Sequence, residues 1–247
     1  MGDRYLQQKL GNKLRRFFKK SPLTFLRSSF NIFYNYLSRY LGYFYFKYLN
    51  LNRFFIFQGK KYRYFYHLYN FSHRNERCVE IAIAQDIIGR YEGKNILELG
   101  NVLSYYLKHS GDILDKYENK KGIIQKDIID FHPDKKYDLI ISISTLEHIG
   151  RDDGSNDQDK IFLVIGKLKN ILAPGAKLFF TLPIGYNQFL DKYIKEEKLD
   201  LSEKYFMKRI SKDNRWQEVD KEEALQQSYG RPYNAGNAIM IGIIKNI

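Results

Sequence analysis

One turn between an expected strand and an expected helix has the composition of a cofactor-binding loop, but with a single glycine. The run NILELGNVLSYYL, residues 95–107, is apolar, reaches Glu98 and turns at Gly100. A loop that binds a dinucleotide repeats glycine where the backbone approaches the pyrophosphate. Gly100 can take a positive φ, and Asn101 tolerates left-handed geometry and can cap a helix that begins at Val102. The free N–H groups of that helix would face a ligand carboxylate, or the turn is a tight connection without a ligand.

A histidine beyond a second apolar run can act as a general base. YDLIISIS, residues 137–144, predicts a buried strand, and His148 follows it after a short gap. An unperturbed histidine has a pKa of about 6.5, which suits proton transfer at neutral pH. A histidine in this setting is also often a helix cap or a packing residue. Ser144 and Thr145 lie at the strand end, where short hydroxyl side chains contact ligands or form turns.

The elements that must position these residues begin near Arg77. From there short apolar runs alternate with helical periodicity, which predicts an α/β sheet with helices on its faces. The expected helices cover residues 79–91, 101–110 and 159–172. The expected strands cover residues 95–100, 112–117, 122–129, 137–144 and 177–183, and an antiparallel pair, 204–211 and 238–245, is expected at the sheet edge.

The connection between the second and third expected strands is unusually short. The stretch YENKKG, residues 117–122, is all that joins DILDK to the next apolar run. A parallel crossover normally needs about a dozen residues or more. Either the usual helix is absent here and the sheet edge is rearranged, or one of the strand predictions is wrong.

Charge and aromatic residues are distributed unevenly along the chain of 247 residues. Residues 1–75 contain 15 Lys and Arg and one acidic residue, Asp3, whereas residues 76–247 contain 26 Lys and Arg and 27 acidic residues. The first section also holds 23 of the 39 Phe and Tyr residues. We therefore place a domain boundary near Asn75, between a basic, aromatic-rich region 1–75 and an α/β domain 76–247.

The basic region 1–75 is predicted to contain a helical stretch followed by a hairpin. Residues 9–49 are mostly compatible with helix, with a break at Ser21-Pro22, and residues 53–67 predict a hairpin around Gln58-Gly59. Its composition suits an anionic membrane surface, a nucleic acid backbone, or plain packing on the following domain. A membrane crossing is not expected, because charged residues such as Arg39 interrupt every apolar stretch before it reaches about 18 residues.

Cysteine usage and the chain start indicate the compartment. The sequence has one cysteine, Cys78, and therefore no disulfide framework. No apolar stretch with a small-residue cleavage site follows the basic start. We expect a cytoplasmic protein, with peripheral attachment to a membrane as an option.

Residues 95–184 resemble the class I methyltransferases that use S-adenosylmethionine. The resemblance rests on five segments in order, NILELG, DILD, QKDIIDF, YDLIISISTLEHIG and LKNILAPGAKLFFTLP. It implies a Rossmann-like doubly wound, mostly parallel seven-stranded sheet and S-adenosylmethionine as the cofactor. This cofactor has no phosphate, so one close turn at Gly100 suffices, whereas the family usually shows Gly-x-Gly-x-Gly.

The resemblance also implies roles for the residues of the first two strands. Glu98 matches the acid that orients the loop or reaches the methionine ammonium, while Gly100 and Asn101 form the turn. Asp115 matches the acid that accepts both ribose hydroxyls, since a carboxylate offers an acceptor pair to a diol. Glu118 is the nearby competitor for this role.

Further roles follow for the third and fourth strands. Asp127 matches the acceptor of the adenine amine and Ile128 the apolar neighbour on the ring; a solvated loop aspartate is the alternative. Ser144 lies where the strand end meets the cofactor. His148 matches the catalytic base, since methyl transfer needs alignment of the acceptor and removal of a proton where the acceptor is a hydroxyl.

The acceptor is expected at residues 182–193 and 215–237, which are rich in aromatic and amide side chains. The candidates, which suit a sugar or another ring-bearing small molecule, are Tyr186, Asn187, Trp216, Tyr229 and Tyr233. Core packing near the last two strands is the alternative, above all for Trp216. The acidic loop 151–160 lacks the spacing of a calcium loop, so no metal is expected. The sequence therefore predicts a methyltransferase for a small molecule or glycan, with an RNA methyltransferase and a non-catalytic scaffold as alternatives.

Overall fold

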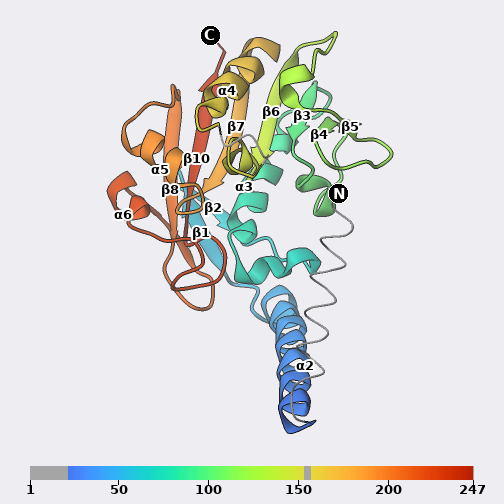
Figure 1. The fold of residues 1–247 in the computed structure, drawn as a ribbon, viewed down its shortest axis with the longest axis vertical. Coiled ribbons are helices and arrows are strands. Elements are labelled where there is room, and N and C mark those ends of the chain that lie inside the picture. The colour runs from blue at the N-terminus through green and yellow to red at the C-terminus, as the bar shows by residue number, and fades with distance from the viewer. Residues whose placement is uncertain (1–21, 153–156, 247) are drawn as a thin grey trace. The chain divides into compact units, whose positions relative to one another are not determined.

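An eight-stranded sheet forms the centre of the second part of the chain in this computed structural model, which describes residues 22–152 and 157–246 (Figure 1). Packing divides the chain into two units, residues 1–50 and residues 51–247. The strands of the larger unit, in their order across the sheet, are β5 (Ile124–Gln125), β4 (Asp112–Asp115), β3 (Ile96–Leu99), β6 (Tyr137–Ile143), β7 (Leu172–Pro183), β10 (Ala238–Lys245), β8 (Glu203–Arg209) and β9 (Trp216–Val219).

The parallel half of the sheet reverses direction next to its first strand. The chain begins at β3, moves outward to β4 and β5, and then returns to β6 on the other side of β3, with all of these pairs and β6–β7 parallel. In open α/β sheets, ligands bind beyond the carboxyl ends of the strands at such a reversal. The loops that follow β3, β4 and β6 therefore converge on one place.

The other half of the sheet is antiparallel. β10 lies between β7 and β8 and pairs antiparallel with both, and β8 pairs antiparallel with β9. The expected pairing of 204–211 with 238–245 is confirmed, but β9 rather than this pair forms the edge. The α/β class with a mostly parallel doubly wound sheet is confirmed, with eight strands instead of the expected seven.

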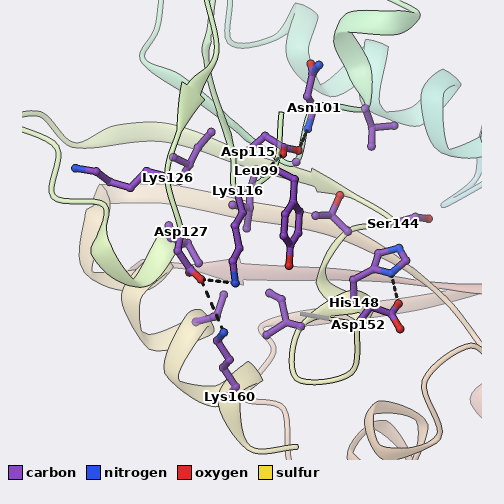
Figure 2. Close-up of a pocket in the computed structure, with 18 of the residues that line it drawn as sticks. Leu99, Asn101, Asp115, Lys116, Lys126, Asp127, Ser144, His148, Asp152 and Lys160 are labelled. Carbon is purple, nitrogen blue, oxygen red and sulfur yellow. Dashed lines mark hydrogen bonds and ion pairs between the residues drawn. The ribbon is translucent and has the colours of Figure 1, made fainter. Parts of the chain in front are cut away.

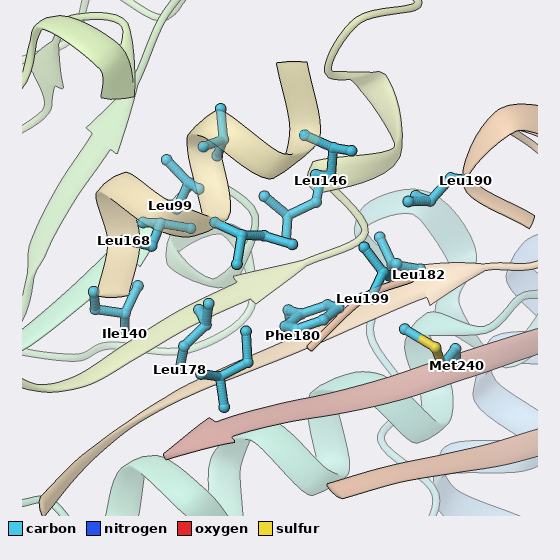
Figure 3. Packing of buried hydrophobic residues seen from close by; sticks show 14 of the residues in the cluster. Leu99, Ile140, Leu146, Leu168, Leu178, Phe180, Leu182, Leu190, Leu199 and Met240 are labelled. Atoms are coloured by element: carbon cyan, nitrogen blue, oxygen red, sulfur yellow. The ribbon is translucent and has the colours of Figure 1, made fainter. Parts of the chain in front are cut away.

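Helices cover both faces of the sheet because its central strands are buried on both sides. Ile140 of β6 packs with helix α4 (Lys160–Ile171) in one apolar cluster, shown in Figure 3, whereas its neighbours Leu139 and Ile141 pack with helix α3 (Arg77–Gly89) in another. Successive side chains of a strand point to opposite faces, which explains this alternation. Each fully buried aliphatic side chain contributes about 1.5–3 kcal/mol to stability. Two short helices, α5 (Gln188–Lys195) and α6 (Lys221–Leu225), belong to the antiparallel half.

The helix expected over residues 101–110 does not form. A single 3-10 turn, Leu103–Tyr105, follows the glycine turn instead. The ring of Tyr105 stacks on Tyr69 with centroids 4.4 Å apart, and Tyr106 packs edge-on against the same ring at 5.3 Å. These aromatic contacts, made by a segment distant in sequence, replace the continuation of the helix.

The short connection between the second and third strands also has no helix. β4 and β5 are parallel and pair through Leu114 with Ile124 and Asp115 with Gln125. Of the two alternatives raised by the short connection, the missing helix is therefore the correct one, and the third strand is reduced to two residues.

The expected hairpin consists of β1 (Phe54–Phe57) and β2 (Lys60–Arg63). Gln58 and Gly59 form its two-residue turn with φ of 50° and 69°, the conformation of a type I′ turn. Phe55 and Phe57 are buried in the cluster that contains α3. Packing thus joins residues 51–75 to the sheet, although the change in composition lies near Asn75.

In the part of the smaller unit that the structure describes, residues 22–50, the chain forms a long helix. Helix α2 (Pro22–Phe44) continues into a π-helical turn, Tyr45–Leu49. Pro22 stands at the first helical position, which proline tolerates because its missing N–H has no partner there. The part of the expected helical stretch before Pro22 lies outside the described residues. Among the described helices, none combines the length and apolar character that a membrane span requires.

Candidate active site

A cavity of about 470 Å³ opens at the carboxyl ends of the parallel strands, beside the reversal between β3 and β6 (Figure 2). Loops after β3, β4, β5 and β6 and the start of α4 form its wall. The polar and charged residues that line it are Arg77, Asn101, Asp115, Lys116, Lys126, Asp127, Ser144, Thr145, His148, Asp152 and Lys160. Leu99, Gly100, Val102, Leu114, Tyr117, Ile128, Ile149 and Val164 complete the wall.

Gly100 is required by the close approach of the two central loops. It has φ of 81°, as its position in a tight turn predicts, and a Cβ built on it would lie 2.4 Å from Oγ1 of Thr145. The left-handed conformation favours glycine, and the contact leaves no room for another side chain. The loop after β3 therefore presses directly on the end of β6.

Glu98 is fully buried and shapes this loop from behind. Its Oε1 accepts hydrogen bonds from the N–H groups of Val102 at 2.7 Å and Leu103 at 2.6 Å, and its Oε2 lies 2.7 Å from Nε2 of His109. Glu98 is not part of the cavity wall. Of the two roles considered for this acid, the geometry supports orientation of the loop.

The expectation that helix N–H groups face a ligand carboxylate is wrong. No α-helix begins at Val102, and its N–H is already bonded to Glu98. Asn101 does not cap a helix; its N–H donates to Oδ2 of Asp115 at 3.1 Å, and its side-chain amide donates to Glu118 at 2.5 Å. The N–H groups of Asn101, Val102 and Leu103 are thus bonded to two acids of the protein, and that of Gly100 donates to the backbone oxygen of Leu114.

Asp115 is held rigidly beside the cavity. Its Oδ1 accepts from the N–H groups of Tyr117 and Glu118, both at 2.8 Å. Glu118 is not one of the residues that line the cavity. Its carboxylate accepts hydrogen bonds from Lys120, Tyr105 and Asn101, which lower its pKa to about 2. The structure therefore favours Asp115 over its competitor as the acid that faces a ligand.

Asp127 and Ile128 follow β5, the strand next to the one that ends in Asp115, and also line the cavity. Asp127 caps the 3-10 turn Ile128–Asp130 by accepting from the N–H of Ile129 at 3.1 Å, and its Oδ2 lies 3.1 Å from Nζ of Lys116 and 3.8 Å from Nζ of Lys160. Burial acts to raise its pKa, but the Ile129 N–H and Lys116 outweigh it and the pKa is lowered. Figure 2 shows both lysines directed at this carboxylate.

Ser144 and His148 follow β6 and face the cavity in different ways. Ser144 is buried with φ of 39°, and its hydroxyl donates to Oε1 of Glu80 at 2.6 Å. His148 is exposed at the cavity wall, with Nδ1 2.5 Å from Oδ2 of Asp152. The hydroxyl of Tyr186 donates to the same carboxylate oxygen at 2.7 Å. The His148 hydrogen bond is the main cause that lowers the pKa of Asp152.

The expected acceptor residues do not all meet. Tyr186 and Tyr229 form an edge-to-face pair with centroids 5.0 Å apart, and Tyr186 lies equally close to the ring of His148. Asn187 instead caps α5. Trp216 is buried in the core and donates to Asn214, so of its two expected roles the structure supports core packing and not acceptor binding. The ring of Tyr233 lies under Arg209.

Several cavity residues were not expected from the sequence. Arg77 begins α3, far from the strand ends in sequence, and Lys116 and Lys160 resemble ordinary surface lysines. The spacing of Asp152 four residues after His148 was the one available signal for a pair. In the described parts of the chain no cluster of His, Cys, Asp and Glu forms a metal site, and residues 153–156 of the acidic loop lie outside them.

No family model matches the chain, and no curated protein does. Among solved structures, it is similar to the N-methyltransferase NodS from Bradyrhizobium japonicum WM9 in complex with S-adenosyl-L-homocysteine, with 15% identity, 69% of this chain and 91% of that chain covered, and a TM-score of 0.40. The plantazolicin methyltransferase BpumL has 15% identity, with 67% and 84% covered and a TM-score of 0.38. A S-adenosylmethionine-dependent methyltransferase from Clostridium acetobutylicum ATCC 824 has 13% identity, with 67% and 89% covered and a TM-score of 0.35. Identities are low, and the proposals below rest on the cavity itself.

Proposed function

We propose that this chain is a S-adenosylmethionine-dependent methyltransferase of class 2.1.1 that acts on a small-molecule or glycan acceptor. The observation that carries the proposal is the rigid carboxylate of Asp115 beside a glycine turn whose N–H groups, from Gly100 to Leu103, all donate within the protein. Such a turn has no anion cradle for a pyrophosphate. A fixed carboxylate at the end of the neighbouring strand suits the hydroxyl pair of a ribose.

The cavity fits the remaining parts of this cofactor. Its volume lies in the range of about 300–1,000 Å³ that is usual for small-ligand sites. Ile128 and Val164 supply apolar surface for an adenine ring, and Asp127 supplies an acceptor for its exocyclic amine. Glu98 holds the turn, and Gly100 keeps it close to Thr145 so that the cavity stays open at the strand ends.

The chemistry requires positioning and one proton acceptor. The cofactor supplies an activated methyl group when bound. The lowered pKa of Asp152 keeps its carboxylate ionised, so it accepts a hydrogen from Nδ1 of His148 and leaves the lone pair of Nε2 available to accept a proton. Tyr186 orders the same carboxylate through its hydroxyl. We assign His148 as the general base and Asp152 as its positioning partner.

Calorimetric titration with S-adenosylhomocysteine tests the proposal. We expect micromolar binding by the wild-type protein. Asp115→Asn should weaken it by about 10- to 100-fold, because a hydrogen bond to a charged group contributes about 1.5–3 kcal/mol. Asp130→Asn, an exposed acid close in sequence, is the matched control and should bind normally. Absence of binding at millimolar ligand would favour the non-catalytic scaffold.

We also infer that α2 brings the enzyme to an anionic membrane surface. The side chains of Phe30, Phe33, Leu37, Leu41 and Phe44 are exposed and recur at spacings of three and four residues. This spacing places them on one face of the helix. Residues 1–75 add 15 Lys and Arg for anionic headgroups.

A further inference from the structure

A group of buried glutamates lies next to the cavity wall and has no part in the cofactor site proposed above. Glu76, Glu80 and Glu147 are each at most 5% exposed. Arg77, which lines the cavity, pairs with Glu80, and Ser144, which also lines it, donates to the other oxygen of Glu80. Glu80 is therefore in direct contact with two side chains of the cavity wall.

The three carboxyl groups differ in how well they are satisfied. Oε1 of Glu80 accepts from the hydroxyls of Ser144 and Thr181, at 2.6 and 2.7 Å, and Oε2 pairs with Arg77. Oε2 of Glu76 accepts from the N–H of Gly236 at 2.9 Å. Oε2 of Glu147 is buried without a hydrogen-bond partner among the described residues.

An unpaired buried carboxyl oxygen is costly, by roughly 1–3 kcal/mol or more for a charged group. Burial raises the pKa of Glu147 well above its usual range, and the negative charges of Glu80 and Glu76 add to the shift while Arg77 opposes it. Burial likewise raises the pKa of Glu76. The guanidinium of Arg77 pairs with Glu80 and does not offset the burial of Glu147, so a cationic ligand beside Glu147 would be stabilised more than a neutral one of the same shape.

Glu147 lies next to the residue assigned as the general base. Its Oε1 lies 3.8 Å from Nε2 of His148, the atom assigned as base. Tyr186 and Tyr229 form the ring pair beside His148; burial is the main cause that raises the pKa of both hydroxyls, and the charge of Glu147 adds to it. Cζ of Arg151 lies 4.2 Å from the ring centroid of Tyr186, whereas Tyr229 is exposed and offers an aromatic face to a ligand.

We propose that the methyl acceptor is an amine, which binds as an ammonium ion with Glu147 as its counter-charge. This inference rests on the proposed function. Nε2 of His148 takes one proton from the ammonium and frees the nitrogen lone pair. The neutral amine then attacks the methyl carbon, a C–N bond forms, and the C–S bond breaks with its electron pair going to sulfur. The products are S-adenosylhomocysteine and the N-methylated ammonium ion.

The test measures binding of matched amine and alcohol pairs to the full chain saturated with S-adenosylhomocysteine. The probes are benzylamine with benzyl alcohol, tyramine with tyrosol, and glucosamine with glucose. At least one amine should bind about tenfold or more tightly than its alcohol. Glu147→Gln should abolish this preference and leave S-adenosylhomocysteine affinity unchanged, and Glu92→Gln, at an exposed glutamate, should retain it.

A second measurement does not depend on the variant. Titration of the wild-type protein with the preferred amine in buffers of different ionisation enthalpy should show release of a proton, because the ammonium favours ionised Glu147. Equal binding of amines and alcohols, or of neither, overturns the inference, as does a preference that survives in Glu147→Gln. Failure to bind S-adenosylhomocysteine instead overturns the proposed function, so the two failures are distinct.

Discussion

The contact between Gly100 and Thr145 shows how a single position controls the site. The same positive φ occurs at Gly93, where a Cβ would meet nothing within 4 Å. The two glycines thus share the cost of left-handed backbone but differ in the available space. A comparison of their alanine variants separates strain from collision.

We expect Gly93→Ala to destabilise the protein by about 1 kcal/mol and Gly100→Ala by about 3 kcal/mol or more. Only Gly100→Ala should also abolish binding of S-adenosylhomocysteine, because its methyl group must displace Thr145 from the cavity wall. Urea unfolding and calorimetry measure the two effects. Equal losses for both variants would contradict the role assigned to the close contact.

Asp191 provides a prediction for pH dependence. It accepts from the N–H of Gly185 at 3.0 Å, and burial raises its pKa to about 6. The folded state therefore binds more protons than the unfolded state between about pH 4 and pH 6, so Asp191 lowers stability as pH rises through this window. Asp191→Asn keeps the acceptor oxygen without the charge. It should stabilise the protein by about 1–3 kcal/mol at pH 7.5 and by little at pH 4.

Denaturant unfolding at several pH values checks this expectation. Asp134→Asn, at an exposed acid, is the control and should show no such pH-dependent gain. A stabilisation by Asp191→Asn that is the same at pH 4 and pH 7.5 would show that its carboxyl group is not held in the buried, protonation-sensitive state.

At the scale of elements, the exposed stripe of α2 makes a prediction about membranes. The full chain should float with vesicles of phosphatidylcholine and phosphatidylserine and much less with phosphatidylcholine alone. The triple change Phe33→Ser, Leu37→Ser, Leu41→Ser should remove flotation, whereas Asn31→Ser with Asn35→Ser should not. Failure with both vesicle types, together with salt-sensitive binding of RNA, would favour the nucleic acid alternative.

In one segment, residues 101–110, tertiary contacts override the local sequence pattern. The pattern of this segment favours a helix. However, two N–H groups near its start donate to the carboxylate of Glu98, and the ring of Tyr69 stacks on Tyr105. Both contacts come from outside the segment. The hairpin at 54–63 was predicted correctly because its turn residues act locally.

At the scale of the molecule, packing and composition place different boundaries. The fragment 51–247 keeps the hairpin and should fold and bind S-adenosylhomocysteine. The fragment 76–247 loses Phe55, Phe57 and Tyr64 from the core, together with the hydrogen bond from the N–H of Trp216 to the Tyr64 hydroxyl. The loss should exceed about 4 kcal/mol, a large share of the usual stability of about 5–15 kcal/mol.

Circular dichroism and thermal unfolding of the two fragments test this boundary. Cooperative unfolding of 51–247 with an unfolded or molten 76–247 would place the domain start after Asn50. A 76–247 fragment as stable as 51–247 would instead support the compositional boundary near Asn75.

The class of fold and the acids at the strand ends can be predicted from the sequence, because apolar runs that form buried strands and the polar residues that end them are local in the chain. Asp115, Asp127 and His148 were found in this way and line one cavity. The tertiary structure alone decided that Glu98 serves the loop and that Arg77 joins the cavity wall. It also brought Glu76 and Glu80 beside Glu147, since burial and charge between segments 60 or more residues apart exist only after the chain has folded.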